Sequence, residues 1–310
     1  MANALGTLFG DIAGAIREKT GDTATMKPAE FPEKIAAIEA GGGGSLPAGA
    51  YWEVLAIPYQ NVYRQKWVEF NGALYAFING TSGNSGFRYI YKYQNNAWSK
   101  VYDAGSLLSI GNANLLEPVE YNGKLHLYGG STNKHYTFDG VSFVTKNALP
   151  GTISDGYRAM FVQDGKLKAH CGSTKTVYTW NEASDAWSAE GNVNDDDGHY
   201  FVINGVVYVF EGINVWTYKD GVRTKYATLA LSPRGCGVEK NGKVYYINGN
   251  STVSAQKLYE FDPETKAVRE VGAIPTMGSS KVLSVCDHRI AFMSYECSFA
   301  STIVLHEVTE

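Results

Sequence analysis

The sequence is poor in cysteine, and its few thiols are not arranged for a metal or a disulfide framework. The 310 residues include only four cysteines, and none forms a C-x-x-C pair. A chain of this length does not need disulfides to fold, so we expect four buried free thiols and synthesis in a cytoplasm. The first 16 residues have no basic stretch, and Asp11 interrupts their apolar residues, so no secretory signal is expected. The cysteines are Cys171, Cys236, Cys286 and Cys297.

Long apolar runs and clusters of basic residues are also missing. No window approaches the ~20 apolar residues of a membrane-spanning helix. The 27 Lys and Arg and 31 Asp and Glu give a formal net charge of -4. Phosphate binding needs clustered positive side chains, so we do not expect nucleic acid binding. The lack of a long apolar run means that we do not expect membrane insertion either.

Aromatic residues and glycine are abundant instead. Aromatic residues make up 13% of the chain, with 21 tyrosines among them. This composition is typical of β-strands that have one buried and one partly exposed side.

A turn dipeptide recurs about every 43 residues, which is the length of one four-stranded propeller blade. Asn-Gly and Asp-Gly pairs supply the two positive φ angles of a type I′ hairpin turn. Six such units predict a six-bladed, all-β propeller over residues 50–310. The turn pairs are Asn71-Gly72, Asn122-Gly123, Asp164-Gly165, Asn204-Gly205, Asn241-Gly242 and a degenerate Asp287-His288.

The second half of each unit is equally regular. Alternating aromatic residues precede a further apolar or aromatic residue, as where Tyr91 and Tyr93 lead to Trp98 and Trp180 leads to Trp187. The alternation predicts the third strand of a blade, and the following residue begins the fourth. These units resemble kelch repeats, although only Gly129-Gly130 keeps the glycine doublet of that family.

The last unit has one strand too few. Its three strand-like runs are 281–286, 289–294 and 301–309, whereas residues 51–57 form an unassigned strand with Trp52 in the place of Trp98. We therefore expect residues 51–57 to complete the last blade, which closes the ring and removes an exposed edge.

Two short amphipathic helices are predicted ahead of the propeller, in residues 1–40, followed by a Gly-rich linker over 41–49. So short a segment is unstable alone, so its apolar stripe must bind another copy, another protein or the propeller. The stripe consists of Leu5, Leu8, Phe9, Ile12, Ile16, Phe31, Ile35 and Ile38.

Candidate binding residues precede the turn pairs by five to seven positions, where innermost strands begin. These positive or imidazole side chains would surround the mouth of the central channel and favour an anionic ligand; alternatively, they bond neighbouring loops. Same-face loops rich in Ser, Thr, Asn and Gly, at 80–87, 103–115, 131–135, 188–198 and 249–256, would add sugar or protein contacts. The candidates are Arg64, Arg158, His199, Arg234 and Lys281, with Tyr59, Tyr63 and Tyr157 nearby.

Catalytic and metal sites are not indicated by the sequence. The six histidines are expected on separate blades as surface or strand residues, which disfavours a copper oxidase of the galactose-oxidase kind. No sialidase S-x-D-x-G-x-x-W turn occurs, and the acidic run 194–198 fails the calcium-loop register because Val193 would take its first position. We expect no metal, no cofactor and no enzyme activity, with a sialate-epimerase-type or oxidase-type enzyme left as the alternative.

The first 40 residues resemble a segment of tail and tail-fibre proteins of bacteriophages and prophages of Gram-positive hosts. The resemblance implies a virion tail component made in the host cytoplasm. Residues 4–40 would attach to other tail proteins or further copies, and the propeller would bind a host surface glycan or protein. A scaffold that binds only virion proteins is a third possibility. The resemblance rests on Leu8-Phe9-Gly10-Asp11-Ile12-Ala13, Ala15-Ile16-Arg17-Glu18-Lys19-Thr20-Gly21 and Lys27-Pro28-Ala29-Glu30-Phe31-Pro32-Glu33-Lys34-Ile35.

Overall fold

The computed structural model describes most of the chain from Tyr51 onward. The predicted helices, their apolar stripe and the Gly-rich linker lie outside the described residues, as do Tyr63 and Tyr157. The described ranges are 51–60, 64–79, 87–95, 97–108, 118–128, 133–153, 158–193, 198–248, 257–273, 281–286, 289–294 and 299–306.

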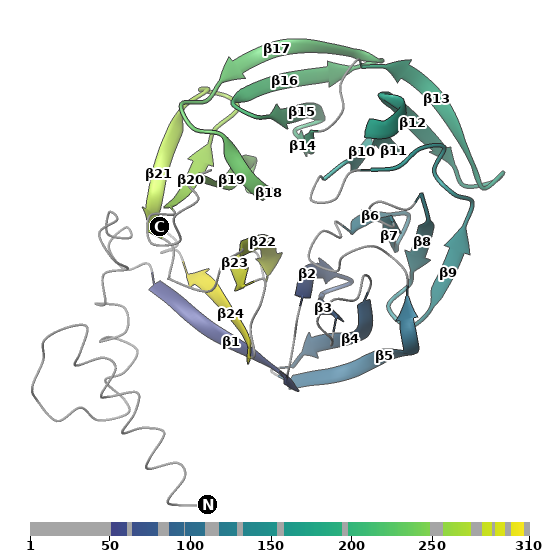
Figure 1. Cartoon of the computed structure of the whole chain (residues 1–310). Helices are drawn as coiled ribbons and strands as arrows, with labels where there is room; N and C mark the ends of the chain where they lie inside the picture. The colour runs from purple at the N-terminus through teal and green to yellow at the C-terminus, as the bar shows by residue number, and fades with distance from the viewer. Residues whose placement is uncertain are drawn as a thin grey trace, which may run out of the picture.

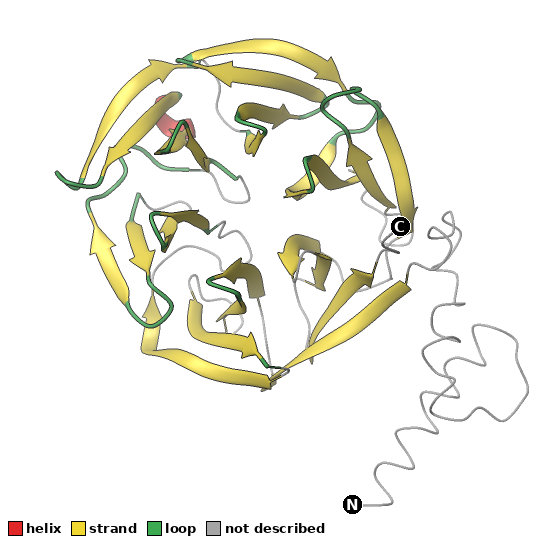
Figure 2. Cartoon of the chain, turned by 180° about the vertical axis from the view of Figure 1, so that it is seen from behind, coloured by secondary structure: helices red, strands yellow, loops and turns green. Residues whose placement is uncertain are grey.

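The strands form six four-stranded antiparallel sheets arranged as the blades of an all-β propeller around a central axis (Figures 1 and 2). Five blades each contain four strands consecutive in sequence, ordered from the axis outward. Blade 1 contains β2 (Arg64–Phe70), β3 (Ala73–Asn79), β4 (Phe87–Gln94) and β5 (Ala97–Leu108). Blade 2 contains β6 (Val119–Tyr121), β7 (Lys124–Tyr128), β8 (His135–Phe138) and β9 (Phe143–Lys146).

Blades 3 to 5 repeat this order. Blade 3 contains β10 (Met160–Gln163), β11 (Lys166–Cys171), β12 (Thr176–Asn181) and β13 (Ala186–Asn192). Blade 4 contains β14 (His199–Ile203), β15 (Val206–Glu211), β16 (Asn214–Lys219) and β17 (Val222–Thr228). Blade 5 contains β18 (Pro233–Lys240), β19 (Lys243–Asn248), β20 (Lys257–Phe261) and β21 (Val268–Ala273). Among the described residues, the 3-10 helix η3 (Gly172–Thr174) is the one helical element.

Blade 6 joins the two ends of the described chain. Its strands β22 (Lys281–Cys286), β23 (Arg289–Ser294) and β24 (Phe299–His306) are completed on the outside by β1 (Tyr51–Gln60). Tyr51 lies opposite His306, and the antiparallel pairing continues to Ala56 and Ser301. The predicted closure of the ring is therefore confirmed, with a strand three residues longer than expected.

The Asn-Gly and Asp-Gly pairs form the predicted turns between the first and second strands. Asn71 and Gly72 have φ angles of 49° and 68°, and the four other described pairs are also positive at both positions. Both signs match a type I′ turn, whose twist suits the flanking strands. The sixth pair, Asp287-His288, lies outside the described residues.

The strand directions give the disc two distinct faces. Innermost strands begin on one face, which we call the entry face, and end at the two-residue turns on the other, which we call the hairpin face. Second-to-third-strand connections and links between blades lie on the entry face, because every sheet is antiparallel.

The core consists of aromatic and aliphatic side chains packed between neighbouring blades. Phe77 of blade 1 contacts Phe138 of blade 2 with ring centroids 5.9 Å apart, and Phe161 of blade 3 stacks on Tyr200 of blade 4 at 4.9 Å. Blades 2, 3 and 4 are thus covered on both sides, which leaves few exposed positions in their inner strands.

Two predicted loops are partly strand. Residues 103–108 belong to β5 and residues 188–192 to β13, because register shifts in both blades let the outer strand continue. Phe87 and His135, also expected in loops, are instead the first residues of β4 and β8.

Candidate functional site

Five candidate positions meet on the entry face around the axis. Arg64, His199 and Lys281 are the first residues of innermost strands, Arg234 is the second residue of β18, and Arg158 lies two residues before β10. Innermost strands contact one another around the ring, as where β22 lies against both β2 and β18. The backbone therefore places these positions at one mouth, as the spacing from the turn pairs predicts.

Arg158 and His199 are joined to each other across blades 3 and 4. The Arg158 backbone N–H donates to His199 Nδ1 at 3.2 Å, and the Tyr200 N–H donates to the Arg158 carbonyl at 2.7 Å. The Arg158 guanidinium lies 5.3 Å from the centre of the Phe201 ring. Because Nδ1 accepts, the imidazole holds the Arg158 backbone in place, and Arg158 as a residue is half-buried.

The other candidates are placed only by their backbone. Tyr59 lies near the end of β1, and Gln60 pairs with Phe299 where β24 begins, at the entry face. The structure therefore locates Arg64, Arg234, Lys281 and Tyr59 on that side of the disc.

Two exposed aliphatic residues on the entry face were not anticipated. Ile213, in the turn between β15 and β16, is 44% exposed, and Leu231, in the link from blade 4 to blade 5, is 41% exposed. The two loops meet where the Leu229 N–H donates to the Ile213 carbonyl at 2.7 Å. Single apolar residues between Gly212 and Asn214 or beside Ser232 have no sequence pattern that signals exposure.

The prediction that the histidines lie apart is wrong for His126 and His135. Both are buried in blade 2, and His126 Nδ1 lies 2.9 Å from His135 Nε2. The His135 ring meets Trp180 and Trp187 of blade 3 at centroid distances of 4.8 and 5.3 Å. We call these four residues the His–Trp seam. The histidines are nine positions apart in the sequence, and neighbouring antiparallel strands bring them together.

Burial makes these imidazoles difficult to charge. It lowers the pKa of His126 to about 4, against an opposing effect of Glu182. It lowers the pKa of His135 to about 3, with His126 and Lys146 acting in the same direction. Both rings are therefore neutral at pH 7, and one proton joins them.

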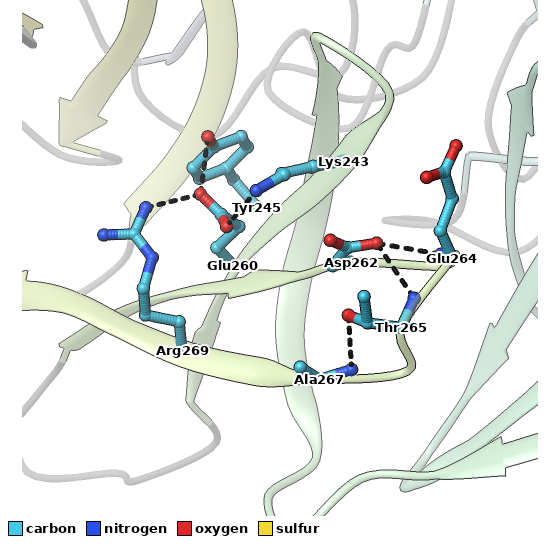
Figure 3. A network of polar contacts seen from close by, with 8 residues as sticks. All are labelled: Lys243, Tyr245, Glu260, Asp262, Glu264, Thr265, Ala267 and Arg269. Atoms are coloured by element: carbon cyan, nitrogen blue, oxygen red, sulfur yellow. Dashed lines mark hydrogen bonds and ion pairs between the residues drawn. The ribbon is translucent and has the colours of Figure 1, made fainter. Parts of the chain in front are cut away.

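Blade 5 contains a second buried polar group, the Glu260 carboxylate (Figure 3). It accepts hydrogen bonds from Lys243 at 2.8 Å, Tyr245 at 2.8 Å and Arg269 at 2.6 Å. Burial alone would raise the pKa of Glu260, but these three donors outweigh it and lower the pKa to about 2. A carboxylate saturated by three donors is a structural anion rather than a catalytic acid or base.

A third network joins blades 3 and 4. Lys168 contacts Glu190 at 2.6 Å and Gln163 at 3.1 Å, and the Tyr218 hydroxyl donates to Glu190 at 2.9 Å. Lys168 and Tyr218 are buried. Their polar atoms are directed at one another, which stabilises the junction of the blades.

The described ranges contain no group of three His, Cys, Asp or Glu side chains that could hold a metal ion. Among the same residues, no helix has the length and apolar character needed to cross a membrane. Of the cysteines, Cys171 is buried and free, and burial raises the pKa of its thiol to about 12.

Comparisons with known proteins agree on the fold alone. No family model matches the sequence, and no curated protein matches it. A Bacteroides thetaiotaomicron protein of unknown function is similar over 83% of this chain and 76% of its own, with 11% identity and a TM-score of 0.58. Virginiamycin B lyase from Staphylococcus aureus is similar over 84% of this chain and all of its own, with 12% identity and a TM-score of 0.53. A putative exported protein of Bacteroides fragilis gives 9% identity and a TM-score of 0.53 over 84% and 96%.

Proposed function

We propose that this protein is a bacteriophage tail or tail-fibre component whose propeller binds a ligand on the host surface. Residues 4–40 would attach it to the particle or to further copies of itself. The kelch-like character of the blades and the absence of enzyme activity belong to the same proposal.

The opposition of the two faces carries this proposal. Tyr51 pairs with His306 at the end of β24, so the segment preceding Tyr51 joins the ring on the hairpin face. Arg64, Arg158, His199, Arg234 and Lys281 begin the innermost strands on the entry face. An attachment on one face and a ligand mouth on the other is the arrangement that an adhesive appendage needs.

The residues of the mouth indicate the chemistry of the ligand. Arginine and lysine bind carboxylate and phosphate groups. An arginine that already packs over an aromatic ring loses little further conformational freedom when it binds such a group. Ile213 and Leu231 add apolar surface to the same face. An acidic cell-wall glycan combines negative groups with apolar sugar faces and fits both features.

The test is binding of the full-length, fluorescently labelled protein to intact Gram-positive cells and to their purified wall glycan. Arg158→Ala should weaken binding at least about tenfold, the loss expected for one charge-assisted contact. The matched control is Lys166→Ala, which removes a positive charge from the hairpin side of the same blade. It should leave the affinity unchanged.

Three results would contradict the proposal. Binding that is equally strong in both variants removes the entry face as the ligand site. Binding to no cell or glycan favours a scaffold that contacts only tail proteins. Chemical change of the glycan, seen as released or epimerised sugar, favours the enzyme alternative, which the similarity in fold to a lyase does not itself support.

A further inference from the structure

The His–Trp seam contains two buried imidazoles in direct contact with each other. The rings of His126 and His135 are stacked with centroids 5.2 Å apart and an interplanar angle of 29°. Tyr121 also contacts His126 edge-on, with centroids 5.6 Å apart. The pair is thus enclosed by aromatic rings of both blades.

The 2.9 Å contact needs one protonated and one bare nitrogen. A first added proton places a cation among aromatic rings at a site without bulk water. A second added proton makes both facing nitrogens donors and abolishes their hydrogen bond. The indoles of Trp180 and Trp187 offer no acceptor for a new N–H group, since an indole only donates.

The charged groups around the pair come from both blades. Lys124 and Lys146 of blade 2 oppose protonation of His126, whereas Glu182, from the turn between β12 and β13 of blade 3, favours it. Lys146 also opposes protonation of His135, which it pairs with across β8 and β9. Burial is the largest effect, and it outweighs Glu182 and the backbone hydrogen bonds to Tyr121 and Asn147, which favour the charged imidazoles.

The junction of blades 2 and 3 also contains a buried apolar cluster, in which Val119 and Tyr128 of blade 2 pack with Met160 and Leu167 of blade 3. Blade 2 has the shortest innermost strand, with three residues in β6. Polar bonds cross at the periphery, from Asn122 to Glu182 at 2.7 Å and from Asn147 Nδ2 to the Asp185 carbonyl at 2.6 Å. These bonds are exposed, so each adds little stability. The junction therefore depends on buried side-chain packing, and the two histidines are the groups in that packing that acid can charge.

We propose that the His126–His135 pair is an acid-sensitive switch that opens the ring between blades 2 and 3. At neutral pH the uncharged pair packs against Trp180 and Trp187 and keeps the blades together. Acid charges the imidazoles, which then move toward water and separate the two blades. The other junctions between blades stay closed.

The direction of the pH effect follows from the linkage between protonation and folding. The folded-state pKa values of both histidines lie below the ordinary value near 6.5, so the unfolded or opened chain takes up protons that the closed ring does not. The stability that the neutral pair contributes is therefore complete above pH 6.5 and is lost as the pH drops to about 4 for His126 and about 3 for His135.

Hydrogen–deuterium exchange of the full-length protein, normalised to the intrinsic exchange rate at each pH between 7 and 3, tests the switch. Peptides from 133–147 and 176–192 should lose protection about one pH unit above peptides from 214–228 and 257–272. His126→Asn with His135→Gln keeps hydrogen-bonding groups without a titrating ring, and should remove that difference.

The control is His170→Gln, which removes a buried histidine that contacts Tyr200 between blades 3 and 4. It should leave the transition of the His–Trp seam in place. The switch would be overturned if all described junctions between blades of the unmodified protein lost protection at the same pH. A double variant that still loses protection first between blades 2 and 3 would also overturn it. If the double variant is unfolded at pH 7, His135→Gln alone replaces it, and the order of seams in the unmodified protein decides.

Discussion

A buried charged side chain in this propeller is stabilised by its hydrogen-bond partners, and its burial does not follow from its position in the sequence pattern. Glu260 stands between Tyr259 and Phe261, where simple alternation would place it on a solvated side of the strand. The structure instead gives it 4% exposure, because Lys243, Tyr245 and Arg269 surround its carboxylate. Alternation in the sequence therefore could not predict this anion, and only the three-dimensional arrangement of its donors explains it.

Replacing Glu260 by Gln should destabilise the protein by about 2 kcal/mol at pH 7. This is less than the loss for a wholly enclosed ion pair, because Lys243 and Arg269 reach solvent. The folded-state pKa of about 2 lies below the ordinary value, so the stabilisation is complete above about pH 4.5 and disappears as the pH falls toward 2. Urea denaturation of both proteins at pH 7 and pH 3 measures the difference.

The matched control is Glu270→Gln in the same blade. Glu270 pairs with Lys257 at 2.7 Å, but both side chains are about one-third exposed. Glu270→Gln should lower the free energy of unfolding by less than about 1 kcal/mol. A loss at Glu270 as large as that at Glu260 would show that burial does not distinguish the two carboxylates.

The strands and turns were the most predictable elements. Asn-Gly and Asp-Gly at fixed spacing are local signals, since the positive φ angles they adopt are intrinsic to those residues. The pairing of β1 with β24 was also predictable, by counting strands per unit. The His126–His135 contact was not, because it depends on the register of β7 and β8 across a connection with no turn signature.

The junction of β13 with the turn between β16 and β17 depends on two glycines. A Cβ at Gly191 would lie 2.9 Å from the Gly221 Cα, and Gly221 has a φ of 81°. Gly191→Ala should therefore cost about 1–3 kcal/mol by forcing blades 3 and 4 apart. The urea midpoint of the variant measures this cost.

Ala186→Ser, at the exposed start of the same strand, is the comparison and should change stability by less than about 0.5 kcal/mol. A Gly191→Ala midpoint equal to that of the unmodified protein would mean that β13 and the turn between β16 and β17 separate without cost.

The ring as a whole is held by the pairing of its first and last described strands. A circular permutant should therefore fold, with His306 joined to Tyr51 through Asn-Gly and new ends in the exposed turn at Ser184. Paired residues lie within about 5.5 Å of each other, a span that a two-residue hairpin covers. The permutant should unfold cooperatively within a few degrees of the parent in calorimetry. A permutant that unfolds in two steps would show that closure needs the natural order of the strands.

The pairing of Tyr51 with His306 also determines how the molecule can be mounted on a surface. Both ends of the described chain leave from the rim of the hairpin face, next to each other on blade 6. A bead, a sensor chip or a fused carrier attached directly before Tyr51 or directly after His306 would leave the opposite mouth directed into solution. Several copies tethered this way on one support would present their mouths in the same direction, so weak single contacts could add up to firm adhesion.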